Sequence, residues 1–201
     1  MVKSKETESH IHDAARSVFL AKGYDGARMQ EIADEAGINK ALLHYYFRSK
    51  DKLFESIFQE AFSKIVPQLF TLLTGSFTLR EKLGGFIENY IRVIAENPFV
   101  PGFILHEMNR NPDRIVSMLS ASGIQPAMIL GALSQELEKN NVYVPDPRHL
   151  IVNLLALCLF PFAGRPIIQG FLFGGDKEAY EVFLSERAEI IKEFVFKSLG
   201  I

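Results

Sequence analysis

Apolar residues recur every three or four positions along most of the chain, the spacing of one face of an α-helix, and strand-like alternation is scarce. Four helices are predicted in the N-terminal part. The first ends at Gly23, the third begins after Asn39 and reaches about Tyr46, and Ser49 can cap the fourth. Their apolar faces contain Ile11, Ala15, Val18 and Phe19, then Met29, Ile32, Ala33 and Ala36, and in the fourth Leu53, Ile57, Phe58 and Phe62.

Helix start and stop signals continue through the rest of the chain. Residues 78–81, Thr-Leu-Arg-Glu, form a capping box that opens a helix ended by Asn97-Pro98. Asn111-Pro112 and Asp146-Pro147 each place a cap residue before a proline, which marks a helix start. The last helix is expected from about Asp176 to Leu199. We therefore predict an all-α fold of nine to eleven helices without a sheet.

Residues 29–47 have the pattern of two short helices that cross closely. Ala33 is small enough for the crossing, and Gly37, four positions later, tolerates the positive φ of a tight turn. The core-facing positions are Ile32, Ala36, Ile38 and Leu43. An ordinary helical hairpin also uses Ala and Gly in this way. Three helices in phase before a basic helix start favour a helix-turn-helix instead.

Three segments carry a more specific likeness: Gly23-Tyr24, residues 32–38 (IADEAGI) and residues 43–53 (LHYYFRSKDKL). In order and spacing they resemble the TetR family of transcriptional regulators. The resemblance implies a three-helix DNA-binding domain over residues 1–50 and a helical ligand-binding and dimerisation domain over residues 51–201. It also implies a homodimer through the last two long helices, here roughly Pro147–Ala163 and Asp176–Leu199, and favours repression of transcription.

The second helix of the crossed pair is the expected recognition helix, whose first turns meet base edges in the major groove of double-stranded operator DNA. Base contacts are expected from its outward side and from the helix before it, and phosphate contacts from His44, Tyr46 and Lys50. Tyr46 has packing beneath Phe47 as its alternative. The predicted DNA-binding residues are Arg28, Gln30, Asn39, Lys40, Ala41, Leu42, His44, Tyr45, Tyr46 and Lys50.

The chain departs from the family pattern at three places. Ala27-Arg28 replaces the usual Ser or Thr before the second helix, and the lost side-chain cap costs about 1 kcal/mol. Ala41 stands where Gly is common, and His44 where an aromatic residue is common. These changes affect which operator sequence is read rather than the mode of binding.

The resemblance also implies a small-molecule cavity among the middle helices. Soft and aromatic side chains there suit an apolar effector, although each of them also suits an ordinary core. The candidates are Phe86, Tyr90, Phe103, His106, Met118 and Met128, with Met108 beside them. His106-Glu107 lacks the second histidine of a zinc helix, so neither a metal site nor a cofactor is predicted.

Composition and charge restrict the function classes and the cellular location that the sequence allows. The net charge is −2, without the basic excess of many nucleic-acid binders, but four cations and one aspartate give residues 40–52 a local charge of +3. The lone Cys158 and the lack of a secretory signal favour the cytoplasm. The apolar stretch Leu150–Ala163 is shorter than the roughly 20 residues of a membrane span. The sequence contains no glycine-rich phosphate loop and no nucleophile motif, so it does not favour an enzyme. A partner-binding adaptor without DNA affinity is the other alternative.

Overall fold

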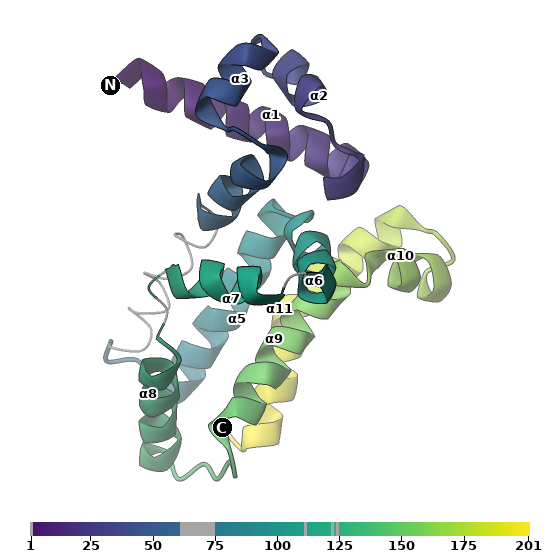
Figure 1. Ribbon diagram of the computed structural model, residues 1–201. Helices are drawn as coiled ribbons and strands as arrows, with labels where there is room; N and C mark the ends of the chain where they lie inside the picture. Colours follow the sequence, from purple (N-terminus) through teal and green to yellow (C-terminus); the bar gives the residue numbers. More distant parts are fainter. Residues whose placement is uncertain (1, 61–74, 111, 122, 124) are drawn as a thin grey trace. The chain divides into compact units, whose positions relative to one another are not determined.

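The computed structural model describes residues 2–60, 75–110, 112–121, 123 and 125–201, and only the backbone of residues 2–5, 103, 106 and 110. These residues form helices joined by turns, with no β-strand among them, which confirms the all-α prediction (Figure 1). The helices are α1 (Val2–Gly26), α2 (Met29–Glu35), α3 (Lys40–Tyr46), a helix over residues 50–60, α5 (Leu79–Glu96), α6 (Val100–Arg110), α7 (Pro112–Ala121), α8 (Pro126–Lys139), α9 (Pro147–Ala163), α10 (Arg165–Ile167), the π-helical turn η1 (Ile168–Leu172) and α11 (Lys177–Leu199).

The helices form two compact units, and each is built from two separate stretches of the chain. The first unit combines Met1–Ser63 with Asn97–Ser122, and the second combines Lys64–Glu96 with Gly123–Ile201. The unit that contains the helix-turn-helix therefore also contains α6 and α7. The domain limits expected from the sequence, 1–50 and 51–201, divide the chain by function and remain a prediction.

Aromatic rings fill the centre of the first unit. Phe19 of α1 lies 5.3 Å from Phe54, ring centre to ring centre, and Tyr24 lies 5.2 Å from Phe54. Phe99, just before α6, lies 5.9 Å from both phenylalanine rings. Edge-on and tilted pairs at these distances are favourable beyond simple burial. They join the N-terminal helices to the segment that leads into α6.

Most of the predicted helix starts and stops are found where the sequence indicated. The Asn39 side chain accepts from the Leu42 amide at 2.7 Å, and the Ser49 hydroxyl accepts from the Lys52 amide at 3.2 Å. The capping box is complete, because the Thr78 amide donates to Glu81 at 2.8 Å and the Glu81 amide donates to the Thr78 hydroxyl at 3.2 Å. Asn111 and Phe62 lie outside the described residues.

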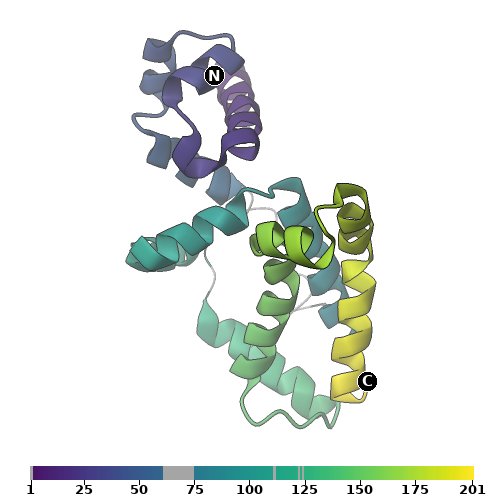
Figure 2. The same cartoon turned by 90° about the vertical axis from the view of Figure 1, so that its right-hand side faces the viewer.

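In the second unit α5, α9 and α11 pack against one another, and α8 packs against α9 (Figures 1 and 2). Their shared core is centred on Ile87, Cys158 and Ile191, all at most 1% exposed. Tyr180 of α11 is also fully buried, and its hydroxyl donates to the carbonyl of Pro161 inside α9. This hydrogen bond satisfies a buried acceptor at the end of α9.

In the described part of the chain, no single helix has both the length and the apolar character needed to cross a bilayer. Two bent pairs of helices meet that test only in combination.

Two glycines give a matched test of the turn that joins α2 to α3. Gly37 has φ +61°, whereas Gly131 lies inside α8, and a Cβ added at either would meet no atom within 4 Å. We expect Gly37→Ala to lower the free energy of unfolding by about 1–2 kcal/mol, because an L side chain is strained at positive φ. Gly131→Ala should raise it by about 0.5–1 kcal/mol, because alanine favours a helix interior. Urea unfolding followed by circular dichroism measures both, and equal effects would contradict this account.

Candidate nucleic-acid interface

The crossing of α2 and α3 has the geometry that the sequence pattern predicted. Ala33 and Leu43 are completely buried. Gly37 takes a left-handed conformation, and the turn closes with hydrogen bonds from the Ile38 amide to the Ala33 carbonyl at 3.0 Å and from the Gly37 amide to the Asp34 carbonyl at 3.1 Å. The chain therefore reverses sharply, and α3 begins with its apolar side on α1 and α2.

The outward side of α3 is free for a ligand. Lys40, Ala41, Leu42 and Tyr45 are all exposed, and Tyr45, 81% exposed, is among the most exposed apolar side chains of the described chain. Because Tyr45 is mostly exposed, folding of this unit alone does not account for a large apolar group at this position, and Leu42 beside it is 37% exposed. A surface of this kind, with a lysine at its first turn, suits the floor of a DNA major groove.

Arg28 and Gln30 lie at the start of α2 and are exposed. Arg28 occupies the cap position without a side-chain cap, as expected, and the Glu31 carboxylate accepts from the Arg28 amide at 3.2 Å. Gln30 donates to Asp34 at 2.8 Å. The Arg28 guanidinium is thus not needed to close the helix.

His44 and Tyr46 both have contacts inside the unit. The Nδ1 atom of the exposed His44 lies 3.3 Å from the Arg48 carbonyl, so this nitrogen is the donor. The half-buried Tyr46 ring packs on the core and lies 6.5 Å from the Phe47 ring. This contact agrees with the packing alternative for Tyr46, while its partial exposure leaves the hydroxyl available to a phosphate.

Lys50 is more tightly held than the sequence indicated. Its ammonium group donates to the carbonyls of Tyr24, Ala27 and Asp25 at 2.7, 3.1 and 3.3 Å, and it lies 4.5 Å from the centre of the Tyr24 ring. All three N–H donors of the lysine are therefore engaged with the end of α1 and the residue that follows it. A phosphate contact by Lys50 remains a prediction, and it would require exchange of these partners.

An ion-pair cluster that the sequence pattern did not predict surrounds Arg114 of α7. Its guanidinium lies 3.1 Å from Glu107 of α6, 3.2 Å from Glu55 and 3.5 Å from Asp51, and it also donates to the Asp51 carbonyl at 3.3 Å. Glu107 is only 4% exposed. These partners lie up to 63 positions away from Arg114, so no local spacing could have indicated them.

The cluster extends to α1 through a hydrogen bond from the Tyr24 hydroxyl to Asp51. This bond, with the Arg114 charge, holds the pKa of Asp51 below its ordinary value. Burial opposes the charged form of Arg114, but Glu107, Asp51 and Glu55 outweigh it and raise the pKa of the guanidinium. A continuous set of polar contacts thus runs from α6 and α7 to the end of α1.

The predicted effector residues are distributed over both units. Met118 is buried in the core of the first unit. In the second, the rings of Phe86 and Tyr90 stack 5.5 Å apart, and Met128 is 45% exposed on α8. The side chains of Phe103 and His106 lie outside the described residues. Their role in binding an effector stays a prediction.

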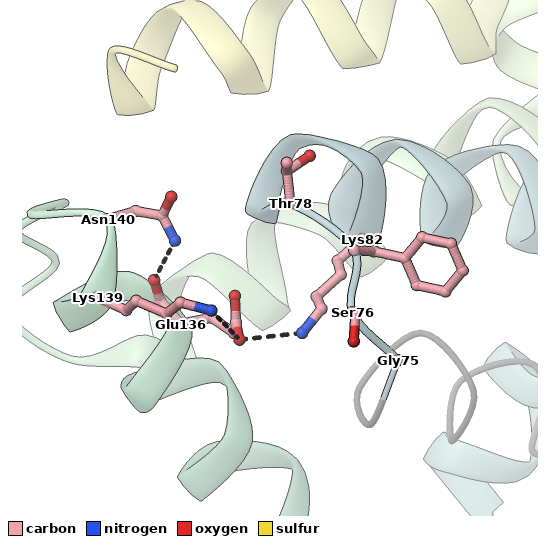
Figure 3. Close-up of a pocket in the computed structure, with 8 residues that line it drawn as sticks. Gly75, Ser76, Thr78, Lys82, Glu136, Lys139 and Asn140 are labelled. Carbon is pink, nitrogen blue, oxygen red and sulfur yellow. Dashed lines mark hydrogen bonds and ion pairs between the residues drawn. The ribbon is translucent and has the colours of Figure 1, made fainter.

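The second unit also contains a hollow of about 470 Å³ with a polar wall (Figure 3). Glu136 points between two lysines there, at 3.0 Å from Lys82 and 4.0 Å from Lys139. The wall residues are Gly75, Ser76, Phe77, Thr78, Lys82, Glu136, Lys139 and Asn140. None of the predicted effector residues is among them, and both lysines pair with the same Glu136 carboxylate.

Comparison with known proteins agrees with the geometry of the interface. The profile of the family described as bacterial regulatory proteins, tetR family, matches residues 11–57. YttP, a probable HTH-type transcriptional regulator of Bacillus subtilis (strain 168), is 25% identical over 178 residues, 87% of this chain and 86% of that protein. NicS, an HTH-type transcriptional repressor of Pseudomonas putida, is 25% identical over 180 residues, 85% of this chain and 82% of that protein.

Solved structures extend the likeness along the chain. A linker-substituted variant of the regulator HlyIIR has a TM-score of 0.65 and 25% identity, and the match covers 92% of this chain and 96% of that one. FadR of Bacillus subtilis, solved with stearoyl-CoA, has a TM-score of 0.64 at 18% identity, over 90% of this chain and 96% of that one, which shows a shared fold. With the helix-turn-helix described above, these findings show that residues 11–57 form a DNA-binding domain of the tetR family of bacterial regulatory proteins and that the chain is a DNA-binding transcriptional regulator.

Proposed function

We propose that this protein is a dimeric, cytoplasmic repressor that binds a pseudo-palindromic operator and leaves it when a small, largely apolar molecule binds. The observation that carries the proposal is the exposed side of α3, where Lys40, Leu42 and Tyr45 face outward from a helix whose other side is fixed in the core. Lys40 can pair with a guanine edge, and the Ala41 and Leu42 methyl groups suit a thymine methyl. Arg28 and Gln30 reach the same groove from α2.

One recognition helix reads too few base pairs to select a site in a genome, so two must act together. Members of this family bind operator DNA and function as dimers. For the interface we propose α9 and α11. Both helices carry exposed large apolar side chains at helical spacing, which a second copy of the chain would bury. These side chains are Val152, Leu155 and Phe160 on α9 and Val182, Ile190 and Phe194 on α11.

Family members also bind small-molecule effectors. NicS is named a repressor, whereas FasR of Mycolicibacterium smegmatis is named an activator. The family likeness favours repression here, and the acyl-CoA bound by FadR of Bacillus subtilis supports a largely apolar effector. Such an effector would bind better to a dimer whose two DNA-binding units are wrongly spaced for the operator. The effector then weakens DNA binding, and bound DNA weakens effector binding by the same factor.

For the coupling we propose the polar contacts around Arg114. The guanidinium joins α6 and α7 to Asp51, and Asp51 accepts from Tyr24, while the neighbouring Lys50 binds the carbonyls of Tyr24 at the end of α1 and Ala27 before α2. A shift of α6 or α7 would change the contacts of this cluster and, through them, the support of α2 and α3. The helix over residues 50–60 is therefore the element that transmits the signal.

Substitution of Lys40 tests the DNA contact. Lys40→Ala should weaken binding to the DNA upstream of the protein's own gene by about 1–3 kcal/mol and relax one base preference, because one base contact is lost. Mobility shifts at several salt concentrations measure both. Lys177→Ala, which removes an exposed lysine at the start of α11, is the control and should bind as the wild type does. Unchanged affinity and preference in Lys40→Ala would reject this placement.

Substitution of Phe194 tests the dimer interface. The ring is 61% exposed within one chain, so Phe194→Glu leaves the core of the subunit intact while placing a charge in the proposed apolar contact. Light scattering after gel filtration should show a monomer at micromolar concentration and a loss of operator binding. Val116→Glu on α7, where the side chain is equally exposed, should remain dimeric. A dimeric Phe194→Glu protein would place the interface elsewhere.

Substitution of Arg114 tests the coupling cluster. Arg114→Met removes the partner of the buried Glu107 and should destabilise the protein by about 3 kcal/mol, since an unpaired buried charge remains. Adding Glu107→Leu should restore much of the stability without restoring the contact to Asp51. Thermal unfolding measures the first effect and operator affinity the second. If the stable double variant binds operator as tightly as the wild type, the cluster does not support the DNA-binding helices.

A further inference from the structure

Arg187 lies on the buried side of α11. It follows Leu184 by three positions and precedes Ile191 by four, so it continues the stripe of Tyr180, Leu184, Ile191 and Val195 that forms the core of the second unit. A helix normally places an apolar side chain at such a position. Here the position holds a permanent positive charge.

The charge of Arg187 has no anion within the described part of its unit. Its Nε atom is buried and has no hydrogen-bond partner, and burial lowers the pKa of the guanidinium. The other four arginines of this unit each have an acceptor. Arg80 donates to the Ile201 carbonyl, Arg92 pairs with Glu96, Arg148 pairs with Asp146, and Arg165 pairs with Glu181. Arg187 is therefore the exception among them, because its buried Nε–H donor has no acceptor, which is unfavourable.

The surroundings of Arg187 are aromatic and uncharged. The guanidinium lies 5.3 Å from the centre of the Phe183 ring. Cys158 of α9 is fully buried, and it lies close enough to Arg187 and to Tyr90 of α5 for an ionised thiolate to influence both. Burial raises the pKa of both the Cys158 thiol and the Tyr90 hydroxyl to about 12, so both groups stay neutral at physiological pH. Tyr90 in turn stacks on Phe86.

We propose that this region between α5, α9 and α11 binds an apolar carboxylic acid, with the carboxylate on Arg187 and the apolar body against Phe86, Tyr90 and Phe183. A carboxylate matches the fork of N–H donors of a guanidinium and supplies the missing negative charge. The neutral Tyr90 hydroxyl can donate to the same group. The three rings and Arg187 keep partial exposure, so a solute can reach them. The inference rests on the proposed effector response and specifies the chemistry of the effector.

A second copy of the chain is a less suitable source of the anion. Ile190 and Phe194, proposed for the dimer, follow Arg187 by three and seven positions and so lie near its face of α11, but the Nε atom of Arg187 is closed off within its own unit. A carboxylate from a partner would have to enter the core to reach this atom. A small molecule can do so without moving another subunit.

Calorimetric titration of the full-length protein tests the site. The probes are 2-naphthoate and decanoate, each compared with its uncharged amide. We expect the wild type to bind at least one acid more tightly than the matching amide, and Arg187→Met to bind that acid at least tenfold more weakly with amide binding unchanged. Lys197→Met removes an exposed cation from the same helix and should behave as the wild type. Arg187→Lys should retain part of the affinity for the acid, because it keeps the charge but loses the fork.

Three results would overturn the proposal: equal binding of acid and amide by the wild type, binding of the acid by Arg187→Met as tightly as by the wild type, or no binding of either acid at millimolar concentration. Light scattering of the same samples identifies a different role, because a monomeric Arg187→Met protein that still binds the acid would assign Arg187 to the dimer. Mobility shifts without probe should be unchanged in Arg187→Met. They separate a failure of this site from a failure of DNA recognition.

Discussion

The close crossing of α2 and α3 determines what this protein presents to DNA. Ala33 is completely buried at the crossing, and the left-handed Gly37 turns the chain so that Leu43 returns to the core. With one side of α3 fixed in this way, the helical period places Lys40, Leu42 and Tyr45 on the opposite side. A larger residue than Ala33 would push α3 outward and change the face that it presents.

Local groups of charged residues matter more in this protein than its net charge does. The chain is slightly acidic overall, yet the recognition helix is followed by a basic segment, and the most elaborate ion-pair cluster surrounds one arginine, Arg114, which three carboxylates neutralise. Arg187 differs, since its guanidinium is partly buried, its Nε atom is closed off from water, and no carboxylate of the described part of its unit pairs with it. The first arginine stabilises an arrangement of helices, and the second requires something from outside its unit.

The composition of the first unit connects recognition to regulation. Phe99 and Met118, from the segments around α6 and α7, pack in the same core as Phe19 and Phe54. A close-packed core transmits small displacements because it has few voids to absorb them. A change in α6 or α7 is therefore a change within the unit that reads DNA.

The sequence by itself determined the local structure: helix limits, the caps at Asn39, Ser49 and Asp146, the turn at Gly37 and the outward side of α3. Each depends on residues within a few positions of one another, and short-range sterics and hydrogen bonds decide them. Only the tertiary structure decided that Lys50 binds carbonyls at the end of α1, that Arg114 joins α7 to residues 51 and 55, and that the Nε atom of Arg187 is buried without an acceptor. These facts depend on which distant helices meet, and the chain-closure entropy and packing that select those contacts leave no periodic trace in the sequence.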